Sequence, residues 1–243
     1  MTRRRWIADQ VSGERAYLVG RNAEHLARVL RARVGQEFEI STGEAVRLGR
    51  IVHVGQDRVE FALGELVPQR EAPRISLLLA VFKFDRMEWA IEKATELGVA
   101  EIIPVIARRT DPHLAKTAAG RRERWRRIAH EAAQQSRRLS PPEMAEPQPL
   151  KAALSLESDL RIVLAENERR TTLKQVLAQN SPSTVDHRPS TVSLAVGPEG
   201  GWTDSELSAF AEAGWTSASL GPAILRAETA AIAALAIATS ELG

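Results

Sequence analysis

The sequence predicts an α/β protein that is preceded by a smaller β-rich segment. From residue 74 onward, apolar runs alternate with helical patterns, which is typical of a mostly parallel sheet covered by helices. Before residue 70, short runs with period-two alternation lie between turn residues, which indicates a small β-barrel or sandwich. Pro68 and Pro73 flank a polar run between the two patterns, so we expect domains at 1–70 and 74–243.

The first domain is expected to hold several short strands and one helix. Leu26, Val29 and Leu30 share a face at helical spacing, which predicts a helix over 22–31. Asn22 is a residue type that caps helix N-termini, and we expect it to begin this helix. The expected strands lie at 16–19, 37–40, 46–48, 50–54 and 58–63.

The second domain is expected to alternate strands with helices. A continuous apolar run over 75–82 is typical of a strand that is buried on both faces. Asp85 and Glu88 have the spacing of a capping box at the start of the next helix, and Gly98 stands where a C-terminal glycine belongs. Further strands are expected at 100–105, 161–165, 191–196 and 217–220, and helices at 120–138, 173–178, 203–214 (with Glu206 completing a capping box) and 228–239.

Composition excludes several kinds of site. The chain has no cysteine, which rules out disulfides, thiolate metal sites and a cysteine nucleophile. Its five histidines lack zinc-motif spacing, and we expect no bound metal. Neither the dinucleotide GxGxxG pattern nor a P-loop occurs. No apolar stretch is long enough for a signal peptide or a membrane span, so we expect a cytoplasmic protein without membrane contact.

Basic residues are concentrated although the net charge is only +2. Between residues 108 and 138, ten Lys and Arg residues occur with three acids. Such a stretch suits a polyanion, and the alternative is a solvated helix face. A second basic set near the N-terminus could hold phosphates, with the same alternative; it comprises Arg3, Arg4, Arg5, Arg28, Arg31 and Arg33.

Two glycine-containing loops stand at strand-to-helix turns near the C-terminus. In the first, over 196–202, glycines let the backbone approach a ligand and Pro198 stiffens the turn. The second covers 220–230, contains Gly221 and leads into the last expected helix. Because open α/β sheets bind ligands at the carboxyl ends of their strands, we expect a site for a nucleoside or an anionic group here.

Four motifs occur in order at 85–98, 131–138, 196–201 and 220–230. Together they resemble the small-subunit ribosomal RNA uracil-N3 methyltransferases of the SPOUT superfamily, and the resemblance covers nearly the whole chain. It implies a C-terminal α/β domain with a deep trefoil knot that binds S-adenosylmethionine, a PUA-like N-terminal RNA-binding domain, and a homodimer. It also implies N3 methylation of one uridine of 16S rRNA in the decoding region of the small ribosomal subunit.

By this resemblance, three loops contact the methyl donor, mostly through backbone groups. For Ile224 and Leu225, plain core packing is the alternative. The expected cofactor-binding residues are Leu164, Ala165, Glu166, Val196, Gly197, Pro198, Glu199, Gly200, Gly201, Ser219, Leu220, Gly221, Ile224 and Leu225. The expected RNA-binding residues are Arg3, Arg4, Arg5, Arg28, Arg31, Lys83, Arg108, Gln134, Arg137 and Arg138.

Two residues are candidates for catalysis. Uridine N3 carries a proton at neutral pH, so the developing imide anion must be stabilised or the proton removed. We expect Arg226 to stabilise the anion, with an ion pair to Glu228 as the alternative. Glu228 is a candidate base if its surroundings favour the protonated form, and otherwise it is an acid placed by the helix dipole.

Two other functions remain open at this point. One is a SPOUT methyltransferase that acts on another base or on a ribose hydroxyl. The other is a ribosome-assembly RNA-binding protein with a degenerate cofactor site, against which the intact glycine loops and Arg226 speak.

Overall fold

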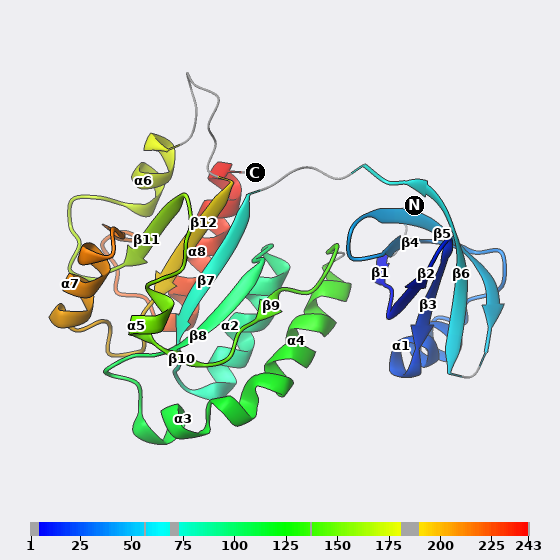
Figure 1. Cartoon of the computed structure of the whole chain (residues 1–243), viewed down its shortest axis with the longest axis horizontal. Helices are drawn as coiled ribbons and strands as arrows, with labels where there is room; N and C mark the ends of the chain where they lie inside the picture. Colours follow the sequence, from blue (N-terminus) through cyan, green and yellow to red (C-terminus); the bar gives the residue numbers. More distant parts are fainter. Residues whose placement is uncertain (1–4, 56, 69–72, 137, 181–189, 243) are drawn as a thin grey trace. The chain divides into compact units, whose positions relative to one another are not determined.

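The computed structural model describes residues 5–55, 57–68, 73–136, 138–180 and 190–242 (Figure 1). Contacts divide the chain into two compact units. Unit 1 comprises Met1–Arg70 and Ala133–Pro141, and unit 2 comprises Glu71–Ala132 and Pro142–Gly243. The segment Ala133–Pro141 therefore groups with unit 1, whereas the expected domain boundaries placed it in the second domain, at 74–243. One contact that contributes to this grouping is the hydrogen bond from Ser41 Oγ to the main-chain oxygen of Leu139.

Unit 1 is built on a curled six-stranded sheet in the order β1-β4-β5-β6-β3-β2. The β1–β4 pair is parallel and the other pairs are antiparallel. The two runs expected at 46–48 and 50–54 form one strand, in which Gly49 lets β4 approach closely: a Cβ there would lie 2.3 Å from Ile40 Cγ1. The strands are β1 (Arg5–Ile7), β2 (Gln10–Ser12), β3 (Arg15–Val19), β4 (Glu37–Ser41), β5 (Val46–Val54) and β6 (Arg58–Leu66).

The helix of unit 1 differs from the sequence prediction at its start. It consists of α1 (Gly20–Glu24) followed by a π-helical turn, η1 (His25–Val29). Asn22 as N-cap is wrong, because the cap is Val19 and has no side-chain hydrogen bond. The Asn22 side chain is a donor instead: its Nδ2 donates to the Asp9 carboxylate at 3.1 Å, and the same carboxylate accepts from the Val19 N–H at 2.8 Å.

Unit 2 contains a parallel sheet in the order β10-β8-β7-β12-β11-β13, and β9 also pairs with β8. All of its described pairings are parallel, as the alternation of strands and helices predicted. The run expected at 75–82 is fully buried, and most of it forms β7. The strands are β7 (Arg74–Ala80), β8 (Glu101–Ile106), β9 (Glu143–Met144), β10 (Gln148–Pro149), β11 (Leu160–Leu164), β12 (Thr191–Val196) and β13 (Thr216–Ala218).

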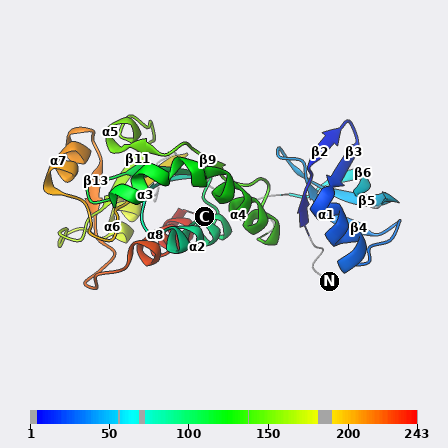
Figure 2. The ribbon, with the colours of Figure 1, turned by 90° about the horizontal axis from the view of Figure 1, so that it is seen from below.

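Helices cover both faces of this sheet (Figure 2). One hydrophobic cluster joins α2 (Phe84–Glu96), α4 (Arg122–Gln135), α6 (Leu173–Gln179) and α8 (Ala227–Leu242) to one face. A second cluster packs α5 (Leu150–Ala153) and α7 (Asp204–Glu212) against the other. Two further short elements, α3 (Pro112–Thr117) and η2 (Ala119–Arg121), precede α4.

The helix-end predictions have mixed outcomes. The capping box at Asp85 and Glu88 is wrong: α2 is capped by Lys83 without a side-chain bond, and Glu88 accepts two bonds from Arg124 at 2.6 and 2.7 Å. The box between Thr203 and Glu206 at the start of α7 is confirmed. Gly98 is confirmed in the left-handed conformation, with a φ of +95°, that ends α2.

Candidate cofactor site

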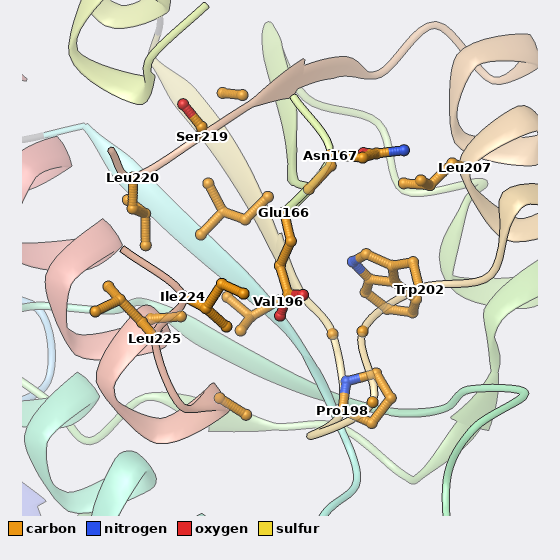
Figure 3. A pocket seen from close by; sticks show the side chains of 18 of the residues that line it. Glu166, Asn167, Val196, Pro198, Trp202, Leu207, Ser219, Leu220, Ile224 and Leu225 are labelled. Atoms are coloured by element: carbon orange, nitrogen blue, oxygen red, sulfur yellow. The ribbon is translucent and has the colours of Figure 1, made fainter. Parts of the chain in front are cut away.

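A cavity of about 280 Å³ lies at the carboxyl ends of β11, β12 and β13 (Figure 3). Its volume is just below the usual range for small-molecule sites, which begins at about 300 Å³. Three loops line it, namely those that follow these three strands, together with Arg109 and residues at the starts of α7 and α8.

The cavity brings together thirteen of the fourteen expected cofactor-binding residues. Glu199 is exposed and does not line it. The thirteen are Leu164, Ala165, Glu166, Val196, Gly197, Pro198, Gly200, Gly201, Ser219, Leu220, Gly221, Ile224 and Leu225.

Apolar side chains form one wall of the cavity. Leu220, Ile224 and Leu225 extend from the loop after β13, and Val196 faces them from the end of β12 (Figure 3). Ile224 is 78% exposed, so the alternative that its side chain is plain core is wrong. An exposed isoleucine at the rim of a cavity is suited to cover the flat face of a nucleobase.

The first glycine loop is held from outside by the segment that follows β8. Arg109 Nη1 donates to the main-chain oxygens of Gly200 at 2.5 Å and Trp202 at 3.3 Å. The buried carboxylate of Glu206 accepts from the Arg108 N–H at 2.7 Å and from the Thr203 N–H at 2.9 Å. The loop conformation is therefore set before any ligand binds.

Side-chain packing and backbone bonds anchor the loops further. Trp202 packs edge-on against Phe210 with ring centroids 5.0 Å apart, and Phe210 packs likewise against Trp215. The loops after β11 and β13 are tied together, because the Ser219 N–H donates to the Thr171 oxygen at 2.9 Å. Gly201 has a φ of +68°, a backbone conformation that residues with a side chain rarely adopt.

Sequence reasoning missed the role of Arg109, which it counted only as part of the basic stretch. The only local signal near this contact was the capping box at Thr203 and Glu206. It predicts the start of a helix but does not indicate that Arg109 binds the preceding loop. Arg109 and Gly200 are 91 residues apart in the chain, so their contact depends on the strand order.

The two candidate catalytic residues lie beside the cavity but do not line it. Arg226 is exposed and directly follows the lining residue Leu225. Glu228 is 5% exposed, and its Oε1 accepts from Arg86 Nη1 at 2.5 Å. The ion pair considered between Arg226 and Glu228 is thus made by Arg86 instead. Glu228 Oε2 is buried without a hydrogen-bond partner among the described residues.

The expected RNA-binding residues of the N-terminal region differ in exposure. Arg3 and Arg4 lie outside the described residues. Arg5 pairs with Glu39, its Nε and Nη2 lying 3.0 and 2.9 Å from Oε2. Arg28 pairs with Glu24 at 2.7 Å on the same helical segment. Arg31 is exposed and adopts a φ of +50°.

The remaining RNA-binding candidates come from both units. Lys83 and Arg108 are exposed. Gln134 is half-buried, and its Nε2 has no hydrogen-bond partner in the described part of the chain. Burial lowers the pKa of Arg138 to about 10. Arg137 lies outside the described residues.

Within the described ranges, no group of three or more His, Cys, Asp or Glu side chains is arranged to hold a metal ion. In the same ranges, no helix is both long and apolar enough to cross a membrane.

Comparison with known proteins reveals clear similarity. Residues 70–239 match the model of the RNA methyltransferase domain family. The chain is 30% identical over 222 residues to ribosomal RNA small subunit methyltransferase E of Bacillus subtilis, covering 90% of this chain and 87% of the relative. For the protein of the same name from Rickettsia conorii the identity is 32%, over 88% of this chain and 85% of the relative.

Solved structures agree with these relatives. A Neisseria gonorrhoeae ribosomal RNA small subunit methyltransferase E bound to S-adenosylmethionine superposes with a TM-score of 0.80 at 27% identity, covering 97% of this chain and 96% of the other. A putative methyltransferase from Legionella pneumophila, also in complex with S-adenosylmethionine, gives a TM-score of 0.80 at 28% identity, covering 99% and 98%.

Proposed function

The chain belongs to the ribosomal RNA small subunit methyltransferase E family, and on that premise we propose that it transfers the methyl group of S-adenosylmethionine to N3 of one uridine in 16S rRNA. The observation that carries the proposal is the three-loop cavity with its thirteen expected residues. Related proteins from N. gonorrhoeae and L. pneumophila bind S-adenosylmethionine in crystals, and this chain aligns with nearly their whole length.

The lining of the cavity fits an adenosyl cofactor with an amino-acid tail. Leu220, Ile224 and Leu225 offer an apolar surface for the adenine ring, and the glycine loop offers main-chain donors and acceptors. Glu166 and Arg109 add charged side chains to the lining. The cofactor, when bound, supplies an electrophilic methyl group on a sulfonium centre.

The protein's own residues contribute positioning and electrostatics. The loops that line the cavity are held in place by hydrogen bonds and packing, so they fix the orientation of the methyl donor. Such alignment of reacting atoms can remove several kcal/mol from a barrier. Arg226 is exposed next to the cavity wall, where its guanidinium stabilises the negative charge that develops on the uracil oxygens as N3 is methylated. Glu228, buried against Arg86, serves as an ion-pair partner that orders the start of α8.

Several finer features belong to the same proposal. The loops around the cavity thread as a trefoil knot, which fits the return of α8 from the edge strand β13 to pack against α2 and β12. The curled sheet of unit 1 is a PUA-like barrel that binds RNA with exposed cations such as Arg31. In unit 2, the exposed cations Lys83 and Arg108 bind RNA as well.

The protein acts as a homodimer on the small ribosomal subunit in the cytoplasm. Trp89 on α2 is 47% exposed, and the enrichment of tryptophan in protein–protein interfaces supports a subunit contact on that helix. The partner subunit contributes to the RNA-binding surface.

A methyl-transfer assay tests the proposal. The purified chain is incubated with methyl-labelled S-adenosylmethionine and either small ribosomal subunits or bare rRNA, and the RNA is digested to nucleosides. Label in 3-methyluridine is the expected result. Label in a ribose-methylated nucleoside or in another base would show a different acceptor, and failure to bind the cofactor would identify an RNA-binding protein without this activity.

A further inference from the structure

Glu166 places a carboxylate inside the cavity. It follows β11, and its side chain extends between Val196 and Trp202 (Figure 3). A Cβ built on Gly201 would lie 3.8 Å from Glu166 Oε2, so the carboxylate rests against the glycine loop. Glu166 has neither a side-chain hydrogen bond nor an ion pair among the described residues.

The other charged groups of the cavity do not neutralise this carboxylate. Arg109 directs Nη1 to the main-chain oxygens of Gly200 and Trp202. Arg169 lines the same cavity and forms no ion pair with Glu166. Asp204, at the start of α7, is a second acid. Glu166 is exposed, so its carboxylate is hydrated.

A ligand that fills the cavity must replace that water. A carboxylate that loses its hydration is costly unless a cation or hydrogen-bond donors take its place. An adenosyl cofactor with an amino-acid tail carries two cationic groups, the sulfonium and the α-ammonium. Either one would supply the charge that the protein leaves out.

We propose that the Glu166 carboxylate is the electrostatic partner of a cationic group of the bound cofactor and thereby selects cationic over neutral adenosyl ligands. The inference rests on the proposed function, because it takes an adenosyl cofactor as the occupant of this cavity. It goes further in giving one side chain a defined task in recognition.

The test compares three ligands on the full chain by isothermal titration calorimetry. S-adenosylmethionine has both cations, S-adenosylhomocysteine has only the ammonium, and 5′-methylthioadenosine has neither. The substitution Glu166→Gln removes the charge and keeps the shape. We expect the substitution to lower the affinity for S-adenosylmethionine about tenfold, as for loss of a charged hydrogen bond. The affinity for 5′-methylthioadenosine should be unchanged.

The second ligand identifies which cation is bound. If the affinity for S-adenosylhomocysteine falls as much as that for S-adenosylmethionine, the partner of Glu166 is the ammonium. If only the affinity for S-adenosylmethionine falls, the partner is the sulfonium. Glu157→Gln is the matched control, because it removes the same charge from an exposed side chain outside the cavity lining, and it should leave all three affinities unchanged.

Two results would overturn the inference. An equal loss of affinity for all three ligands would mean that Glu166 contacts the ribose hydroxyls or shapes the cavity. An unchanged affinity for S-adenosylmethionine would mean that Glu166 does not contribute to cofactor binding. A wild-type chain that fails to bind S-adenosylmethionine would instead overturn the proposed function, so the two failures are distinguishable.

Discussion

Arg86 of α2 and Glu228 of α8 form an ion pair of 2.5 Å between two helices whose first turns lie side by side. The Glu228 side chain is 6% exposed and that of Arg86 is 34% exposed. Because a buried carboxylate without its partner is costly, Arg86→Ala should lower the free energy of unfolding by about 2–4 kcal/mol. Urea denaturation measures this change.

A neighbouring pair provides the control. Arg124 also binds a carboxylate of α2, that of Glu88, but its side chain is half exposed to water. Arg124→Ala should therefore cost much less stability than Arg86→Ala. Equal losses for the two variants would show that burial of Glu228 does not set the strength of its pair.

Arg226→Ala should separate catalysis from cofactor binding. The side chain is exposed and does not line the cavity, so the affinity for S-adenosylmethionine should persist. Turnover should fall by more than tenfold, about 1.4 kcal/mol of barrier, since the developing anion loses its cation. Single-turnover methylation of saturating RNA gives the rate, and unchanged turnover would remove Arg226 from the mechanism.

Arg109→Ala should loosen the first glycine loop. The variant loses the bonds to the oxygens of Gly200 and Trp202, so we expect the KM for S-adenosylmethionine to rise about tenfold while kcat changes less. Arg109→Lys keeps one donor and should recover part of the affinity. Steady-state kinetics checks the split, with Lys174→Ala as an exposed control on α6. A fall in kcat at constant KM would contradict the role of Arg109 in holding the first glycine loop.

Asp159 should make stability depend on pH. Hydrogen bonds from the Ser190 side chain and then from Thr191 lower the pKa of this carboxyl below its usual value. Its contribution is therefore present above the unfolded-state pKa and is lost as pH falls through the lower folded pKa. Asp159→Asn should unfold at a lower temperature near neutral pH, and this difference should shrink below about pH 4.

Thermal unfolding of the wild type and Asp159→Asn between about pH 6 and about pH 3 checks this expectation. Glu157→Gln removes a nearby exposed charge and should leave the pH profile unchanged. A constant difference between wild type and Asp159→Asn across the range would show that titration of Asp159 is not linked to folding.

Patterns within short windows allowed much of the fold to be predicted from the sequence. The strand at 191–196, the capping box of Thr203 and Glu206, and the glycine that ends α2 all match the structure. Each depends on residues a few positions apart, so propensity and periodicity are sufficient. Where a side chain outside the window competes, the same reasoning fails: Asn22 does not cap α1, and its Nδ2 donates to Asp9 instead.

The sequence by itself thus determined the α/β class, the two glycine loops and most of the cavity lining. Only the tertiary structure decided the partners of the charged side chains. Arg86 and Glu228 are 142 residues apart, and Arg109 and Gly200 are 91 apart. Such pairs form only after the strand order has brought separate segments together, and many charged residues could have served as partners. Local pattern indicated the glycine loops and the family resemblance indicated the residues around the ligand, whereas packing decides which residues hold the loops in place.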